Sequence, residues 1–381
     1  MRQYKKVLLG VASIVLIIVL AACGNIDDSS SSTSSSGKKT TSVQTTGQVS
    51  KSEYAGVIKN GHYLTSKARG LTANRNSNSL NITSFENGLL GVSKSYYSTS
   101  NYIFQEGQYL TTAKLTNWLG RKSKSNPTGL NPKDNGKKNS SRNPIYVESI
   151  EEQDFMQKNG NSLVLKGITI GIAMNTIDYY QKIKYGVTYQ QTITSKERVA
   201  YGKKVAKLIV ERMRKIKKIG KNVPITIAMY KQAANDSLVG GSFYAKTQTT
   251  SSNISNWEKM NVENKVFPEI SSTSDYASND NKSFENFQSQ IENYFPTISD
   301  VTAQAKYVNK KIAGEQVTIT TQFYSETEII SFTNFIAQVA PKFLPSGVPV
   351  NITVNSANGI QAFLSRSSTQ RNFKSHVFSS Y

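Results

Sequence analysis

The residue with the clearest chemical role in this sequence is its only cysteine, Cys23. Three cations lie within the first six residues, an apolar stretch follows over residues 7–20, and two alanines stand directly before Cys23. A basic start, a short apolar stretch and small residues at its end are typical of a secretory signal peptide over residues 1–22. An uncleaved membrane anchor is disfavoured, because the stretch is shorter than the roughly 20 residues that span a bilayer.

The run Leu-Ala-Ala-Cys at residues 20–23 resembles the lipobox of bacterial lipoproteins. The resemblance implies that lipoprotein signal peptidase cleaves before Cys23 and that the thiol carries a diacylglyceryl group. Two acyl chains on one residue suffice for stable anchoring, whereas one chain is marginal. We therefore expect a lipid anchor at Cys23 that holds the protein on the extracytoplasmic face of the cell membrane.

A second group with possible chemistry is an acidic cluster within seven positions: Glu148, Glu151, Glu152 and Asp154. Carboxylates this close together serve as general acid and base in some enzymes, or bind a cation. Negative charge near the start of a helix, or in a solvated turn, produces the same pattern. The sequence leaves both interpretations open.

Asp236 is a further candidate, because it stands in an Asn-Asp-Ser run after a predicted strand and shortly before two glycines. Strand ends often carry binding sites, but Asn-Asp-Ser is also ordinary turn chemistry. No phosphate-binding loop, nucleophile elbow or metal-binding helix motif occurs, and His62 and His376 lie far apart. We therefore expect no cofactor, no metal site and no enzymatic activity.

The net charge is strongly positive, because 46 Lys or Arg face 25 Asp or Glu, which gives +21. Residues 196–221 alone contain 11 Lys or Arg and two Glu. Four lysines, Lys204, Lys207, Lys215 and Lys218, fall on one face of a predicted helix, opposite its apolar stripe. A signal peptide places the chain outside the membrane, where the available polyanions are anionic lipids and wall polymers such as teichoic acids rather than nucleic acid. The alternative is a solvated helix face without a partner.

The chain after Cys23 divides into a tether and a folded body. Residues 24–50 are rich in Ser and Thr and too polar to fold, so they predict a disordered tether. Short candidate strands follow at residues 61–65, 89–93 and 101–105, and residues 121–143 predict an exposed basic loop.

Two strand–helix–strand patterns follow. The first has a buried strand over residues 163–174, a helix over residues 195–219 that starts with a capping box at Thr194 and Glu197, and a strand over residues 223–230. The second repeats this order with a strand over residues 316–324, a capping box at Ser325 and Glu328, a helix that ends near Pro341, and a strand over residues 348–354.

This repeat predicts an α/β fold, with α+β as the alternative, of two related β-α-β-containing halves with mixed sheets. The expected segments are a signal peptide (1–22), an anchor and tether (23–50), a first α/β domain (51–245) and a second, related one (246–381). Residues 231–300 are polar with isolated aromatic residues, and predict an irregular connection or additional strands.

Several stretches of the sequence occur together in an order that resembles one family. They are Glu-Gln-Asp-Phe at 152–155, Gly-Ile-Thr-Ile-Gly-Ile-Ala-Met-Asn at 167–175, Tyr-Gly-Lys-Lys-Val-Ala at 201–206, Val-Pro-Ile-Thr-Ile-Ala-Met-Tyr-Lys-Gln at 223–232 and Asn-Asp-Ser-Leu-Val-Gly-Gly-Ser-Phe at 235–243. The sequence resembles the CamS family of Gram-positive lipoproteins, described as sex-pheromone precursors.

The resemblance implies that a short apolar peptide is cut from the end of the signal peptide, here Leu-Ile-Ile-Val-Leu-Ala-Ala at residues 16–22. An ordinary signal peptide whose fragments are degraded is the alternative. The resemblance implies no role for the mature body. The first candidate is a module that binds an envelope polymer or a peptide, and the second is a cell-wall hydrolase.

Overall fold

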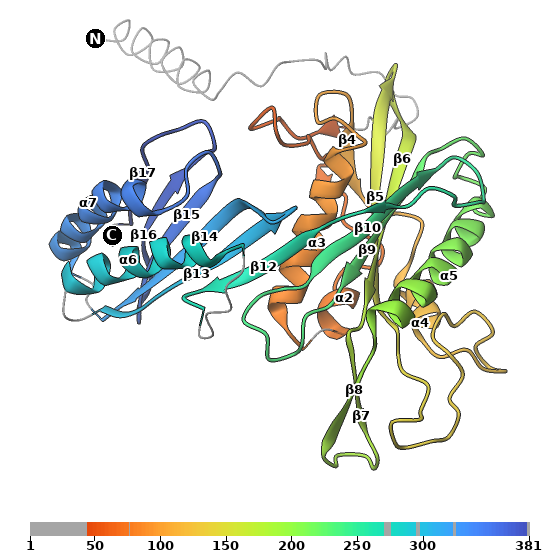
Figure 1. Cartoon of the computed structure of the whole chain (residues 1–381). Coiled ribbons are helices and arrows are strands. Elements are labelled where there is room, and N and C mark those ends of the chain that lie inside the picture. The colour runs from red at the N-terminus through yellow and green to blue at the C-terminus, as the bar shows by residue number, and fades with distance from the viewer. Residues whose placement is uncertain (1–43, 76, 270–275, 295–297, 323–324, 379–381) are drawn as a thin grey trace, which may run out of the picture.

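The computed structural model describes residues 44–378 with the exception of residues 76, 270–275, 295–297 and 323–324. The predicted signal peptide, Cys23 and most of the predicted tether lie outside the described residues. The described chain forms two α/β units, each built on a six-stranded mixed sheet, which lie side by side in Figure 1. None of the described helices is long and apolar enough to cross a membrane.

The first described residues form a small antiparallel sheet of three short strands: β1 (Gln44–Thr45), β2 (Val57–Lys59) and β3 (His62–Tyr63). Thr45 pairs with Val57, and Thr46 Oγ1 accepts a hydrogen bond from the N–H of Gly56 at 2.8 Å. The chain therefore joins the fold before residue 50, where we expected the tether to end. Hydrogen bonds rather than apolar side chains hold these polar residues, so composition gave no sign of them.

The first six-stranded sheet has the order β11-β10-β9-β6-β5-β4. Its strands are β4 (Ile103–Glu106), β5 (Val147–Asn159), β6 (Ser162–Met174), β9 (Ile225–Lys231), β10 (Ser242–Thr249) and β11 (Glu258–Lys259). Neighbouring strands are antiparallel except for β6 and β9, which are parallel. A parallel pair needs a long crossover, and here it consists of the hairpin β7 (Ile177–Gln181) and β8 (Thr188–Thr192) followed by helix α5 (Ser195–Arg214).

The second sheet has the order β12-β13-β14-β15-β16-β17. Its strands are β12 (Val262–Phe267), β13 (Ile298–Val308), β14 (Lys311–Thr321), β15 (Val350–Ser356), β16 (Gly359–Arg366) and β17 (Lys374–Val377). Here β14 and β15 form the parallel pair, and helix α7 (Glu326–Phe343) is the crossover. Helix α6 (Ser278–Tyr294) stands between the first two strands of this unit, as α4 (Thr112–Leu119) does in the first. The prediction of two related halves with mixed sheets is confirmed.

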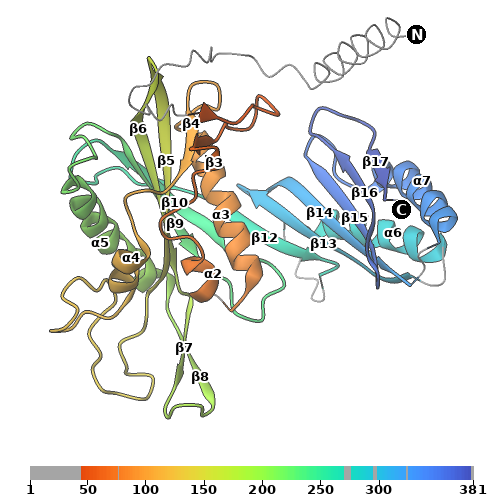
Figure 2. The same ribbon diagram turned by 180° about the vertical axis from the view of Figure 1, so that it is seen from behind.

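Helices cover both faces of the first sheet. On one face lies α3 (Ser79–Lys94), preceded by α2 (Leu71–Arg75), and on the other lie α4 and α5, as Figure 2 shows. Successive residues of β6 alternate between the two cores: Ile172 packs with α4 and α5, and Ala173 packs with α3. Residues 167–174 of β6 are all buried, which explains why this part of the sequence is mostly apolar.

The second sheet buries one face. In β15 the side chains of Val350, Ile352 and Val354 are fully buried under α6 and α7, whereas Asn351 and Thr353 are not. This alternation is typical of a sheet with one face toward solvent. The two units therefore share one connectivity but differ by the α3 layer, which only the first unit carries among the described residues.

The predicted strand at residues 89–93 is wrong, because these residues belong to α3. Phe85, Leu89 and Val92 are spaced four and three apart and line one buried helix face. A short window of the sequence shows only apolar residues, and the helical period becomes visible over the full 16 residues.

The predicted ends of both crossover helices need correction. The capping box of α5 is present: the N–H of Glu197 donates to Thr194 Oγ1, and the N–H of Thr194 donates to Glu197 Oε2. However, α5 ends at Arg214, five residues before the predicted end. Ser325 makes no capping hydrogen bond, and α7 continues through Pro341 to Phe343.

The first unit extends beyond the predicted domain boundary at residue 245. This residue lies inside β10, and β11, with Glu258 and Lys259, adds one more strand to the same sheet. Asn264 in β12 then donates two hydrogen bonds to the carbonyls of Gly240 and Gly241, at 3.0 and 2.9 Å, so the start of the second unit is tied to the first.

Because the two units have separate cores, we expect matched cavities in the two crossover helices to act locally. Ile209 in α5 and Ile336 in α7 are both fully buried. Ile209→Ala and Ile336→Ala should each lower the stability of their own unit by about 2–5 kcal/mol. Hydrogen exchange should show lost protection in β6 and β9 for the first variant and in β14 and β15 for the second. Equal loss in both units for either variant would mean that they unfold as one.

Candidate functional site

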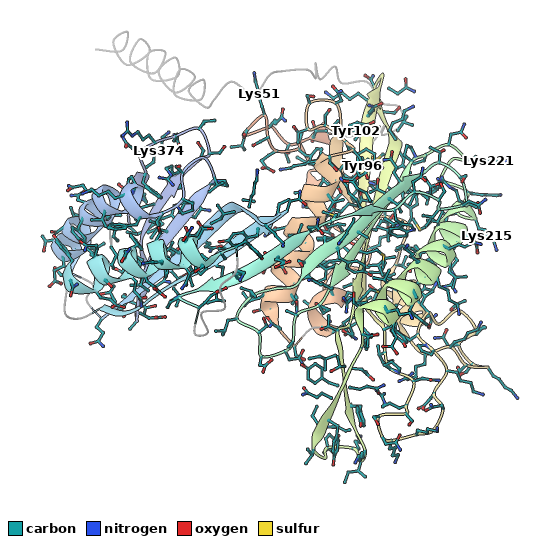
Figure 3. All side chains as sticks on the ribbon, viewed as in Figure 1. Lys51, Tyr96, Tyr102, Lys215, Lys221 and Lys374 are labelled. Atoms are coloured by element: carbon teal, nitrogen blue, oxygen red, sulfur yellow. The ribbon has the colours of Figure 1, made fainter. Side chains whose placement is uncertain are left out.

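Helix α5 carries the lysines on which the binding hypothesis rests. Its apolar side, with Ile209 at the centre, is buried against the sheet, so the opposite side faces solvent. Lys204 and Lys207 are exposed on the helix, and Lys215 and Lys218 are exposed in the turns just after it. Figure 3 shows Lys215 at the edge of the molecule. The structure thus places all four predicted lysines at the surface, two of them beyond the helix.

The loop over residues 121–143 lies against α5. Tyr201 Oη donates a hydrogen bond to the carbonyl of Leu130 at 2.6 Å, and Arg212 Nη1 donates to the carbonyl of Thr128 at 2.9 Å. The exposed lysines of this part of the loop therefore adjoin those of α5. We call the combined group the basic surface: Lys122, Lys124, Lys203, Lys204, Lys207, Lys215, Lys217 and Lys218. Within the described chain none of these lysines forms an ion pair.

The positive charge belongs to one unit. Residues 44–259 contain 32 Lys or Arg and 13 Asp or Glu, a net charge of +19. Residues 260–378 contain 9 Lys or Arg and 10 Asp or Glu, a net charge of −1. A general bias of composition would charge both units alike, so the asymmetry marks the first unit as the one that attracts anions.

The acidic cluster lies on strand β5 rather than at a helix start or in a turn. Glu152 and Asp154 are buried, with 6% and 0% of their surface exposed. Glu152 accepts hydrogen bonds from the N–H groups of Tyr109 and Leu110, and Asp154 accepts one from the N–H of Gln108. The two carboxyls thus fasten the loop between β4 and α4.

Burial raises the pKa of both Glu152 and Asp154, and the neighbouring Glu152 raises that of Asp154 further. The protonated form of Asp154 is therefore favoured relative to that of an exposed aspartate. Neither carboxyl lines either of the two pockets described below. A buried pair of this kind holds the fold together and has no access to a substrate.

Glu151 points to the other face of the sheet, toward α3. One of its carboxyl oxygens is buried without a hydrogen-bond partner. Burial, together with the nearby carboxyls of Glu86 and Glu106, raises the pKa of Glu151 from 4.5 to about 8. Among the described residues no group of His, Cys, Asp or Glu is arranged to hold a metal ion.

A polar pocket of about 250 Å³ lies where the parallel strands β6 and β9 end. The carboxyl ends of parallel neighbours meet at the same edge of a sheet, which is a common place for ligands. Asn175 follows β6, Gln232 follows β9, Tyr179 comes from β7 and Arg75 comes from the end of α2. We call this cavity the strand-end pocket.

The charged groups of the strand-end pocket are already paired. Arg75 Nε lies 3.7 Å from Glu148 Oε1 and donates a hydrogen bond to the carbonyl of Glu148 at 2.8 Å. Asn175 Nδ2 donates to the other carboxyl oxygen of Glu148 at 3.0 Å, and Asp178 forms an ion pair with Arg142. These pairs leave the pocket polar but without an uncompensated charge, so it is suited to a small neutral polar ligand.

The predicted site residue Asp236 lies beside this pocket and does not line it. Asp236 is exposed in the loop after β9, and its neighbour Asn235 lines the pocket and donates its N–H to Tyr179 Oη at 3.2 Å. The strand-end rule thus points to the edge of the sheet where this pocket lies, but Asp236 itself is not among the lining residues. Arg75 and Asn175 were missed, because they come from segments that only the fold brings together.

Fold and surface together define a class of protein: a tandem of two α/β units of one connectivity, of which the first is strongly basic. The family described as the CamS sex pheromone cAM373 precursor matches residues 63–372, and the chain belongs to this family. No curated protein shows a significant similarity to the chain.

Two solved structures support this assignment. The crystal structure of a sex pheromone precursor from Lactobacillus salivarius subsp. salivarius is 51% identical, covers 89% of this chain and 100% of its own, and has a TM-score of 0.86. The C-terminal domain of the sex pheromone staph-cAM373 precursor from Staphylococcus aureus is 28% identical, covers 80% of this chain and 99% of its own, and has a TM-score of 0.70.

The raised pKa of Glu151 predicts a pH-dependent stability. Between about pH 4.5 and 8 the folded state binds a proton that the unfolded state has lost, so the free energy of unfolding falls as pH rises through this window. Glu151→Gln removes this loss and should raise the free energy of unfolding at pH 9 by on the order of 1 kcal/mol or more, while leaving it nearly unchanged at pH 4. Urea titrations at both pH values measure the effect, with Glu292→Gln as the exposed control. An equal effect of Glu151→Gln at the two pH values would contradict the assignment.

Proposed function

We propose that the chain is a lipid-anchored lipoprotein on the extracytoplasmic face of the cell membrane. Cys23 carries the diacylglyceryl group after cleavage by lipoprotein signal peptidase. The order of basic start, apolar stretch, two alanines and a single cysteine supports this proposal. The described body begins 21 residues after Cys23, so the intervening polar chain spaces it from the bilayer.

We further propose that the signal peptide releases the apolar peptide of residues 16–22. The description of the family as a pheromone precursor supports this part. The sequence in this segment is neutral and apolar and ends directly before the cleavage point at Cys23. Such a peptide suits an apolar pocket of a receptor.

The mature body acts as a binding module for anionic polymers of the cell wall, through the basic surface. The observation that carries this proposal is the asymmetry of charge, +19 in residues 44–259 against −1 in residues 260–378. Exposed lysines without acidic partners attract a polyanion over about 8–10 Å, the Debye length at physiological salt. Teichoic acids are the polyanions that a protein outside a Gram-positive membrane meets, whereas nucleic acid is not a partner there.

A hydrolase is the weaker alternative. The carboxyl pair that an acid–base mechanism would use, Glu152 and Asp154, is buried and occupied with backbone N–H groups. The charged groups of the strand-end pocket are paired with each other. We therefore propose a binding role and no catalysis.

Lipid anchoring and peptide release predict the fate of a Cys23→Ala precursor. Without the thiol no diacylglyceryl group forms, and the signal peptidase has no substrate. Labelled palmitate should mark the parent and not the variant, and mass spectrometry of the medium should find the peptide of residues 16–22 only for the parent. A palmitate-labelled Cys23→Ala chain would refute the anchor, and a parent that is labelled but yields no peptide would refute peptide release alone.

The basic surface predicts salt-dependent binding to walls. A soluble chain that begins at residue 24, with Lys204, Lys207, Lys215 and Lys218 changed to Gln, should sediment with wall fragments about tenfold less well at low salt. Four exposed charges at about 0.2–1 kcal/mol each account for this loss. Its binding should also depend less steeply on salt.

The matched control changes four exposed lysines of the second unit, Lys306, Lys311, Lys342 and Lys374, to Gln. It removes the same charge from the whole chain, so an effect of net charge alone would weaken both variants equally. Equal binding curves for the parent and the first variant, or equal losses in the two variants, would overturn the assignment to the basic surface.

A further inference from the structure

A second pocket, of about 470 Å³, lies under the first half of α5. Its walls come from α5, from the last part of β9, from the first part of β10, from β11 and from the start of β12 with the two residues before it. It is larger than the strand-end pocket and shares no lining residue with it. It shares only Lys203 with the basic surface, and the proposal of wall binding does not require the cavity itself. We call it the helix pocket.

The helix pocket contains a buried cation without a counter-ion. Arg198 is 8% exposed, and its Nε–H has no hydrogen-bond partner. Among the described residues its side chain makes one hydrogen bond, from Nη1 to the carbonyl of Ile193 at 3.4 Å, and takes part in no ion pair. Burying a guanidinium without a partner costs free energy. An anion bound beside Arg198 would offset this cost.

The hydroxyl of Tyr244 is a second unsatisfied group in the same pocket. It is buried without a hydrogen-bond partner, and the guanidinium carbon of Arg198 lies 5.7 Å from the centroid of its ring. Gly202 of α5 makes this arrangement possible, because a Cβ there would lie 3.1 Å from Tyr244 Oη and 2.5 Å from Met229 Cε. The helix pocket thus contains two hydrogen-bond donors without an acceptor, the Nε–H of Arg198 and the hydroxyl of Tyr244.

The remaining charges of the helix pocket also favour an anion. Lys203 and Lys231 line it and make no ion pair within the described chain. The two acidic residues of its lining are engaged elsewhere: Glu258 lies 3.4 Å from Lys246 Nζ, and Glu263 accepts a hydrogen bond from the hydroxyl of Tyr276. The first turn of α5, with its positive dipole end, lies at the same wall.

The rest of the lining is apolar and wide. Met229, Met260 and Val199 supply aliphatic surface, and Trp257 supplies an aromatic face with Lys203 Nζ 5.9 Å from its ring centroid. A volume of this size holds a small organic molecule rather than a bare inorganic ion. A ligand with one anionic group and an apolar remainder would match both the cationic and the apolar parts of the lining.

We propose that the helix pocket binds a carboxylate that is attached to an apolar group, with the carboxylate between Arg198 and Tyr244 and the apolar part against Trp257 and Met229. A guanidinium matches a carboxylate in shape and charge. The C-terminus of a short apolar peptide and a fatty acid both have this chemistry, and the experiment distinguishes the two sources.

The experiment is calorimetric titration of the soluble chain that begins at residue 24, with four probes. N-acetyl-leucine represents a peptide C-terminus and octanoate a fatty acid, and N-acetyl-leucinamide and octanol are their neutral counterparts. At least one carboxylate should bind about 10- to 100-fold more tightly than its neutral counterpart, which is the range for a hydrogen-bonded charge. The carboxylate that binds more tightly identifies the source.

Two variants assign the binding to the pocket. Arg198→Met should abolish the preference for carboxylate, and its melting temperature should stay equal or rise, because the change removes an unpaired buried charge. Tyr244→Phe should weaken carboxylate binding several-fold without loss of stability, because its hydroxyl has no partner to lose. Arg212→Met on the same helix, outside the pocket, is the control and should bind as the parent does.

Three results would overturn the proposal: no binding of either carboxylate, equal binding of the neutral counterparts, or unchanged binding by both pocket variants. A large loss of stability in Arg198→Met would mean that Arg198 stabilises the folded state, and this variant would then not test ligand binding. Tyr244→Phe then decides, since weaker binding in this variant supports the pocket and unchanged binding refutes it.

Discussion

The parallel pairing of β6 with β9 is the constraint on which the rest of the first unit depends. Two parallel neighbours cannot be joined by a tight turn, so 50 residues stand between the end of β6 and the start of β9. The hairpin β7–β8 and helix α5 fill this distance. The pairing therefore places α5 across the sheet, the basic surface on the outer side of α5, and the helix pocket under its first half. It also brings the two strand ends together at the strand-end pocket.

The same pairing recurs in β14 and β15, yet the second unit has no comparable excess of positive charge. Its sheet buries one face, and its basic and acidic residues nearly balance. The first unit buries both faces of its sheet and with them Glu152, Asp154 and Arg198. Glu152 and Asp154 have N–H partners, whereas Arg198 has only a long hydrogen bond to one carbonyl. Buried charged groups without partners are expected at functional sites, because they do not stabilise the fold.

The repeat of strand, helix and strand could be predicted because its signals are local. Residues 163–174 are mostly apolar, and Thr194 with Glu197 marks a helix start. The boundaries were less accurate: α5 stops at Arg214 where turns replace it, and α7 continues through Pro341. Pairing partners and burial are long-range properties, so no local pattern indicated that β5 would bury two carboxyls or that Arg75 would lie beside Glu148. The exposure of Lys204 and Lys207 could be predicted because an apolar stripe on a helix determines its exposed face, whereas Lys215 and Lys218 lie in turns beyond the helix. Arg198 was missed because it stands among many exposed cations in the sequence.

The central claim is that one unit of this protein of the CamS family meets the wall and the other does not. Acetylation footprinting of lysines tests it most directly, because each exposed amine reports its own protection while the chain is bound to wall fragments. The account predicts that Lys122, Lys124, Lys204 and Lys207 are protected upon binding and that Lys306, Lys311, Lys342 and Lys374 react as in the free chain. Protection spread evenly over both units, or confined to the second, would contradict it.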